Sequence, residues 1–190
     1  MELQGERLIP ATVPQTWEAL NNPEVLKACI TGCESVERTG DDSFSAAVAV
    51  RVGPVSAKFK GNLKMTNVQA PNSYTINFDG QGGVAGFGKG SADVALTEEG
   101  TQTRLKYLAK AQVGGKMAQV GSRLIDAAAS KIAEDFFKAF EAKLGEMYPA
   151  PAAAAPAPVP EPAAAPGVNR MVWWVAGAVV LALVVYLLRR

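Results

Sequence analysis

Histidine is absent from the 190-residue sequence, and cysteine occurs only twice. Without an imidazole there is no Ser-His-Asp or Cys-His nucleophile pair and no histidine metal ligand. Cys29 and Cys33 are too few for a zinc site or a disulfide framework. Their CxxxC spacing is more typical of packed thiols in a reducing compartment than of redox chemistry, which stays open as the alternative.

An excess of charge of either sign is also missing. Nineteen Lys and Arg residues face eighteen Asp and Glu residues, for a formal net charge of +1. This balance provides no broad basic surface, so we expect no nucleic-acid partner. The acidic residues fall at predicted turns, on polar strand faces and on the outer face of a predicted helix, and none is placed as a buried general base. We therefore expect no catalytic residues and no metal, and a binding protein rather than an enzyme.

Polar residues disappear from one long segment near the end of the sequence. Residues 171–188 contain no charged residue and no Asn, Gln, Ser, Thr or Pro. As a helix they would span about 27 Å, close to the hydrocarbon thickness of a bilayer. Trp173 and Trp174 would lie near one membrane interface and Tyr186 near the other. The sequence predicts a single transmembrane anchor over residues 170–190.

The segment before this run has few large apolar side chains. Residues 149–169 contain seven of the twelve prolines, nine alanines and one charged residue, Glu161. This composition cannot bury a core and favours polyproline II. We predict a disordered Pro/Ala-rich linker over residues 149–169, with a reach of up to about 65 Å when extended.

Residues 1–148 form the predicted folded domain. The first ten residues, MELQGERLIP, carry charges and no apolar stretch, so they do not form a secretory signal. We expect the domain to stay in the cytoplasm and the chain to be a single-pass protein of the inner (cytoplasmic) membrane.

Alternating apolar and polar residues predict strands between Glu34 and Val113, separated by Gly-, Asp- and Pro-containing turns. Two short helices are predicted before them, over Pro14–Leu20 and Pro23–Cys29, with Asn22 as the cap of the second. A three-to-four-residue period predicts one long helix over Lys116–Met147.

This order of elements predicts an α+β fold in which a curved antiparallel sheet grips a long C-terminal helix, because only that helix is available to cover the apolar face of the sheet. Many inward positions hold small residues, such as Ala46, Gly61, Ala109 and Ala128. Small side chains on both walls either leave a cavity or allow close helix–sheet packing, and the pattern alone does not decide between them.

A glycine-rich stretch at residues 79–91, DGQGGVAGFGKGS, partly matches two phosphate-binding fingerprints. Both fingerprints need a helix directly after the glycines, whereas residues 92–97 alternate like a strand. We therefore predict a bulged, flexible turn, with a mobile rim beside a pocket as its functional alternative.

Four blocks of the front domain carry a family resemblance. They are residues 23–36 (PxxLxxCIxGCExV), 52–61 (VGPV through FxG), 86–96 and 113–125 (VGGKMAQVGxRLI). In this order they resemble the G-subunit family of carbon monoxide dehydrogenase over essentially all of residues 1–148. A Pro/Ala-rich tail that ends in a membrane span also occurs in that family. The family usually has proline at the position of Thr31, a departure that touches only a turn.

The resemblance implies a START-like helix-grip domain with a hydrophobic ligand cavity. It also implies an accessory role beside a molybdenum-containing carbon monoxide dehydrogenase, or a related hydroxylase, held at the inner membrane face. The implied ligand is a respiratory quinone, menaquinone or ubiquinone, with no tightly bound cofactor. From the alternation we expect the cavity walls to include these residues: Val48, Val50, Phe59, Leu63, Ile76, Phe78, Phe87, Tyr107, Leu124, Ala128 and Phe136.

Three functions stay open at this point. The first is a tethered binding module that recruits the oxidoreductase and takes up quinone or a similar lipid, with Tyr107 as a polar contact. The second is a pure anchor or assembly factor, for which the outward row Lys58, Lys60 and Lys64 would dock an acidic partner. A solvated strand face is the favoured explanation of this row. The third is an enzyme such as a cyclase or hydrolase on the same fold.

Overall fold

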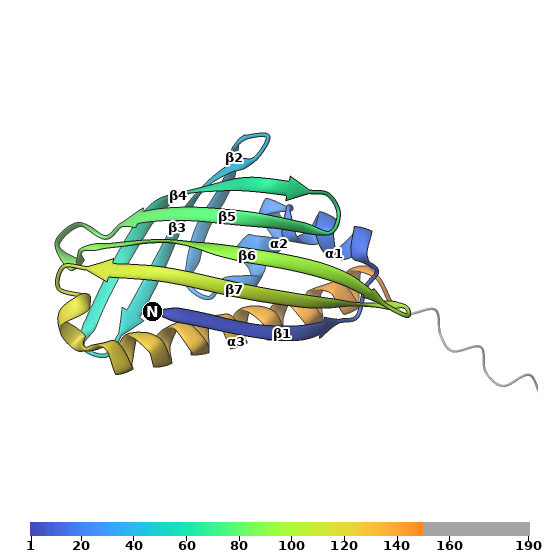
Figure 1. Ribbon diagram of the computed structural model, residues 1–190. Helices are drawn as coiled ribbons and strands as arrows, with labels where there is room; N and C mark the ends of the chain where they lie inside the picture. The colour runs from blue at the N-terminus through green and yellow to red at the C-terminus, as the bar shows by residue number, and fades with distance from the viewer. Residues whose placement is uncertain (150–190) are drawn as a thin grey trace, which may run out of the picture. The chain divides into compact units, whose positions relative to one another are not determined.

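The computed structural model describes residues 1–149, which form one seven-stranded antiparallel sheet and three α-helices (Figure 1). The sheet order is β1-β7-β6-β5-β4-β3-β2, so six strands follow one another as a meander and β1 closes onto the last of them. In chain order the elements are β1 (Glu2–Ile9), α1 (Val13–Leu20), α2 (Pro23–Cys29), β2 (Cys33–Gly40), β3 (Ser43–Val52), β4 (Val55–Gln69), β5 (Ser73–Gln81), β6 (Phe87–Glu99), β7 (Gln102–Gly114) and α3 (Ser122–Met147), with short 3-10 turns η1 (Gly83–Ala85) and η2 (Ala118–Val120).

The two short helices begin where the sequence predicts them. Proline occupies the first turn of both α1 and α2, where its missing N–H would have no intrahelical partner. The side chain of Asn22 accepts a hydrogen bond from the backbone N–H of Glu24 at 3.0 Å, which confirms it as the cap of α2.

The long helix is shorter than predicted. It begins at Ser122 instead of Lys116, and the intervening residues form η2 and a turn. Gly121 separates η2 from α3 with a φ of 97°, a left-handed value that no helix accommodates. Met117 fits the helical period of the sequence but lies outside α3, in a turn whose packing buries it.

α3 runs along one face of the sheet, as Figure 1 shows, and approaches β1 near one edge and β3 toward the other. We call this the inner face of the sheet. The alternation predicted from the sequence is confirmed on it, because Phe44, Met65, Tyr74 and Leu105 all point inward and are buried. The curved sheet, the long C-terminal helix and their order establish the predicted helix-grip arrangement.

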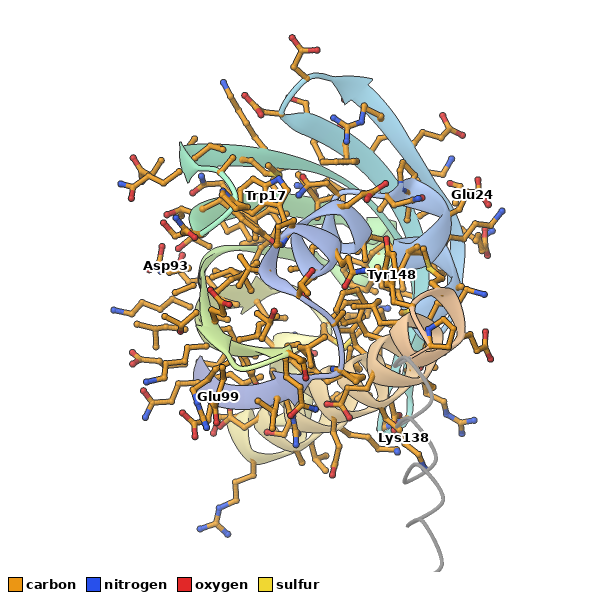
Figure 2. All side chains as sticks on the ribbon, turned by 90° about the vertical axis from the view of Figure 1, so that its right-hand side faces the viewer. Trp17, Glu24, Asp93, Glu99, Lys138 and Tyr148 are labelled. Atoms are coloured by element: carbon orange, nitrogen blue, oxygen red, sulfur yellow. The ribbon has the colours of Figure 1, made fainter. Side chains whose placement is uncertain are left out.

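The dense core lies at one end of the domain, where α1, α2 and the last turns of α3 cover the sheet. Figure 2 looks onto this end, with Trp17 and Tyr148 inside the outline of the sheet and helices and Glu24, Asp93, Glu99 and Lys138 around it. The Trp17 and Tyr74 rings meet edge to face at 5.4 Å. The largest fully buried side chains of residues 1–149 are Phe140, Ile9, Leu105 and Leu144.

Within residues 1–149, no helix is long and apolar enough to cross a bilayer. The anchor predicted over residues 170–190 and, apart from Pro149, the linker predicted over residues 149–169 lie outside the described part of the chain.

Candidate functional site: an apolar space between the sheet and α3

The strand register brings most of the predicted wall residues together on the inner face. Val48 of β3 lies opposite Phe59 of β4, and Leu63 of β4 lies opposite Phe78 of β5. Val50 and Ile76 have the same inward parity on their strands. All six side chains are only partly buried, in contrast to the buried core at the other end.

Glycines form the floor between these side chains. Gly61, Gly80 and Gly88 are aligned across β4, β5 and β6. Rings from neighbouring strands lie over other glycines nearby: a Cβ on Gly82 would come within 2.7 Å of the Phe59 ring. Aromatic rings that cover glycines in this way keep the floor of a sheet low and flat.

One glycine of this row faces unfilled space. A Cβ built on Gly88 would meet no atom within 4 Å, although Gly88 lies inside a strand and on the inner face. By contrast, a Cβ on Gly90, the next inward residue of β6, would lie 2.0 Å from the carbonyl oxygen of Lys110. The sheet therefore leaves open space above Gly88, which favours the cavity over close packing as the use of the small residues.

The helix side of this gap is also incompletely buried. The apolar stripe of α3 begins with Leu124, Ile125, Ala128 and Ile132, and none of these side chains is buried. Leu124 is 48% exposed and Ile132 is 39% exposed. Large aliphatic side chains so exposed on a helix indicate a surface that a ligand or partner covers. We call the region between this stripe and the inward residues of β3–β6 the slot.

At its open end the slot is bordered by a recess of about 560 Å³. Phe87 lies there and not on the slot wall where it was expected. It alternates with inward Gly88, so its ring lies on the opposite side of β6, over Gly114. The recess is lined by Met1, Phe87, Lys89, Ala111, Gln112, Val113, Ala118, Ser122, Ile125 and Asp126.

Tyr107 and Phe136 bound the slot at its inner end. The Tyr107 ring stacks on Phe137 at 5.1 Å, and Phe136 lies 5.2 Å from Phe137 and 5.6 Å from Phe140. A Cβ on Gly5 would lie 2.7 Å from the Tyr107 hydroxyl. That hydroxyl is therefore directed toward β1, away from the slot where a polar contact to a ligand was expected.

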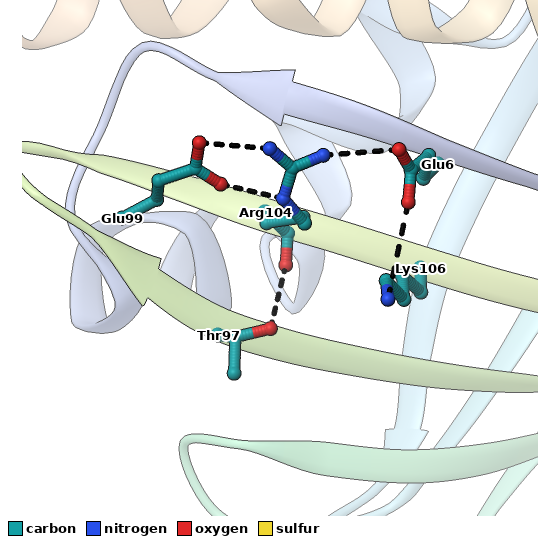
Figure 3. Close-up of polar contacts among 5 residues, drawn as sticks. All are labelled: Glu6, Thr97, Glu99, Arg104 and Lys106. Carbon is teal, nitrogen blue, oxygen red and sulfur yellow. Dashed lines mark hydrogen bonds and ion pairs between the residues drawn. The ribbon is translucent and has the colours of Figure 1, made fainter.

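The outer face of the sheet is polar. It carries two wider recesses of about 680 and 850 Å³, whose linings include charged side chains such as Asp93 and Lys106 in the first and Asp79 and Lys110 in the second. The expected lysine row is present there, with Lys58 paired to Glu34 at 2.6 Å and Lys60 and Lys64 exposed. Arg104 bridges Glu99 and Glu6 across three strands (Figure 3). These groups stabilise a wet surface and do not form an apolar ligand site.

No described residues assemble an evident reactive centre. Burial raises the pKa of both thiols, Cys29 and Cys33, which keeps them protonated and poor nucleophiles. Residues 1–149 hold no cluster of three potential metal ligands among His, Cys, Asp and Glu. What the inner face does offer is a set of partly buried apolar side chains that an apolar molecule could contact.

The sequence profile of CoxG, described as the G subunit of carbon monoxide dehydrogenase, matches residues 5–145. The chain belongs to the CoxG family. Its members are named as subunits of a larger enzyme, which agrees with an accessory role for this domain. A comparison with curated protein sequences finds no match.

Solved structures place this CoxG domain among START-like folds. A conserved protein from Geobacillus kaustophilus is 30% identical with a TM-score of 0.72, and the match covers 77% of this chain and 96% of that one. A START superfamily protein from Mycobacterium smegmatis is 14% identical, with a TM-score of 0.59 and coverage of 77% and 98%. The Zhui aromatase/cyclase from Streptomyces sp. R1128 is 13% identical, with a TM-score of 0.53 and coverage of 75% and 92%. The last two show the fold alone.

The glycine floor is the feature that sequence reasoning missed. Gly80, Gly88 and Gly90 were assigned to a turn, whereas β5 continues to Gln81 and β6 begins at Phe87. The connection is only Gly82–Gly86 and contains η1. A signal was present, because these glycines have the same parity as the inward residues Phe78 and Ala92 on their strands.

Proposed function

We propose that this CoxG protein is a membrane-tethered accessory subunit whose domain binds a respiratory quinone, menaquinone or ubiquinone, in the slot. In this role it recruits a molybdenum-containing carbon monoxide dehydrogenase, or a related hydroxylase, to the inner membrane and links it to electron transport. The observation that supports ligand binding is the unfilled space over Gly88, beside the glycine floor and the incompletely buried first half of α3.

The shape and chemistry of the slot favour a flat apolar ligand. Its floor is low because glycines and ring faces replace upright side chains. Its walls are aliphatic or aromatic, as expected for pockets that remove most of an apolar ligand from water. An open end leaves room for an isoprenoid chain to extend beyond the protein.

The tether rests on the sequence of the C-terminal segment. Eighteen uncharged, mostly apolar residues at 171–188 meet the length requirement of a membrane span. The partner rests on the family, since its name refers to carbon monoxide dehydrogenase. We expect the folded domain on the cytoplasmic side, where such an enzyme would be met.

The ligand is tested on residues 1–149 produced in a host whose membranes contain quinone. This fragment is suitable because the Geobacillus structure, matched over 96% of its length, corresponds to the domain alone. The purified domain is extracted with organic solvent, and quinone is quantified by mass spectrometry. We expect near-stoichiometric quinone in the native domain and a loss of at least about tenfold in Gly88→Leu, because the leucine fills the space above the floor.

Gly145→Leu is the matched control. It is also a glycine whose Cβ would meet no atom within 4 Å, but it is exposed on α3 near the packed end. It should keep its quinone. A domain that contains no quinone and does not bind added menaquinone or ubiquinone would contradict the proposed ligand binding. The protein would then be an anchor or assembly factor. Phospholipid in place of quinone would make the domain a general lipid carrier.

The tether and the partner are tested on the full chain. After a high-salt wash that screens electrostatic docking, native protein should still fractionate with membranes and retain the dehydrogenase there, whereas a chain ending at residue 149 should leave both in the soluble fraction. Membrane-bound dehydrogenase in cells that contain only the truncated chain would contradict the tethering role.

A further inference from the structure

Three connections meet at the open end of the slot, opposite the end covered by α1 and α2 (Figure 1). They are the β3–β4 turn at Gly53, the β5–β6 connection and the segment from β7 to α3. The backbone N–H of Met117 donates to the carbonyl oxygen of Ala85 at 2.9 Å. A Cβ on Gly53 would lie 3.6 Å from Leu124. We call residues 51–54, 82–87 and 115–124 the loop end.

The loop end exposes aliphatic side chains at its extremities. Val84 is 86% exposed, the largest value among the exposed large hydrophobic residues of the described chain, and it projects from a five-residue connection of mostly glycine. Leu124 and Phe87 on the neighbouring segments are 48% and 38% exposed. Exposed apolar side chains gathered beside a ligand entrance mark a contact surface.

The same three segments also carry cations. Arg51, Lys116 and Arg123 are all exposed, and none of them forms an ion pair within residues 1–149. The loop end as defined contains no Asp or Glu, and the next acidic residue along α3 is Asp126, two residues beyond Leu124. Unpaired cations on the same segments as projecting aliphatic side chains complement an anionic phospholipid surface.

We propose that the loop end docks on an anionic phospholipid bilayer, with Val84 and Leu124 entering the headgroup region and the three cations contacting phosphates. The slot then opens at the membrane surface. This inference deepens the proposed function and rests on it for the molecule that passes through the entrance, while the docking itself needs no quinone.

The tether allows this orientation. α3 has 26 residues and is about 39 Å long, so the loop end lies about that far from the point where the chain leaves the helix. The linker predicted from the sequence would reach up to about 65 Å. Because the reach exceeds the helix length, the predicted anchor and the loop end can contact the same bilayer.

Tryptophan placed at position 84 reports lipid contact directly. Residues 1–149 contain one native tryptophan, Trp17, at the opposite end of the domain. The quinone-free domain with Val84→Trp is mixed with phosphatidylglycerol/phosphatidylcholine vesicles that carry brominated acyl chains. We expect a blue shift and quenching. Val68→Trp is the control, because Val68 is also exposed, at 39%, but lies on β4 near the α1 end.

Charge reversal tests whether the cations of the loop end contribute to binding of the anionic bilayer. Lys116→Glu/Arg123→Glu should lower vesicle affinity by about tenfold or more. Lys60→Glu/Lys64→Glu makes the same change in net charge on the outer face and should have a much smaller effect.

Equal fluorescence responses at positions 84 and 68, or equal effects of the two double reversals, would overturn the proposal. Loop-end variants that bind vesicles normally but no longer capture the dehydrogenase would also overturn it and make this surface a protein-docking site. The experiments test membrane docking and quinone binding independently, because vesicle contact is measured without quinone and quinone content is measured without vesicles.

Discussion

The two halves of α3 face the same sheet with very different degrees of burial. In the second half Phe140 and Leu144 are completely buried, whereas in the first half Leu124 and Ile132 keep 48% and 39% of their surface exposed. The helix itself is continuous over both halves. Leu124 also lies about 160° around the helix from Phe140. The difference therefore combines the side of the helix on which each residue lies with what the sheet and the short helices place opposite each half.

A single strand shows how the sheet makes this difference. The inward residues of β6 become smaller along the sheet, from Leu96 through Val94 and Ala92 to Gly90 and Gly88. Leu96 is buried against the dense core, while Gly88 faces unfilled space. The decreasing side-chain size therefore accompanies a densely packed end and an open end on one sheet.

The largest expected effect is the loss of stability when the packed end is emptied. Phe140→Ala should lower the free energy of unfolding of residues 1–149 by about 3–5 kcal/mol, because it leaves a cavity among fully buried neighbours. Leu124→Ala should lower it by less than about 1 kcal/mol, since the side chain is already half exposed. Urea unfolding followed by circular dichroism measures both. Similar losses for the two variants would show that the halves of α3 are equally packed.

A smaller effect is expected from two adjacent inward glycines of β6. Gly90→Leu should destabilise the domain by about 1–3 kcal/mol, because its Cβ would meet the backbone of Lys110 and Ala111 at 2.0 and 2.9 Å. Gly88→Leu should leave the thermal midpoint of the ligand-free domain nearly unchanged, because its Cβ meets open space. Calorimetry separates the two. If Gly88→Leu is as damaging as Gly90→Leu, the space over Gly88 closes in solution.

The packed end could be predicted from the sequence more completely than the open end. The predicted strand alternation agrees with the burial of Phe44, Met65 and Leu105, because apolar bulk at period two has one stable placement. Glycine has no side chain to reveal its face, so Gly80 and Gly88 were assigned to a turn. Parity could also not place Phe87 without the true start of β6, since a strand shifted by one residue presents its opposite face.

The predictions of where α3 begins and of which groups line the slot were wrong for a related reason. A helical period continues through Met117 and Val120, and only the left-handed Gly121 ends it, a backbone property that hydrophobic spacing does not record. The Tyr107 hydroxyl is directed toward Gly5 by packing on Phe137. Such details depend on contacts between segments far apart in the chain, which no local pattern contains.

The smallest expected effect lies on the outer face above the packed end. Arg104 holds the Glu99 carboxylate by two hydrogen bonds, which lowers the pKa of Glu99 from its ordinary value of 4.5 (Figure 3). A lowered pKa in the folded state stabilises the protein above the ordinary value, and this contribution is lost as the pH falls through the folded-state pKa. Glu99→Gln should therefore differ slightly from the native domain at neutral pH and converge with it in acid. Because the group is fully exposed, salt should also shrink the difference. Thermal midpoints compared across pH and salt concentrations measure this difference. A loss of stability as large as that of Phe140→Ala would show that surface charges, and not buried packing, stabilise this end of the domain.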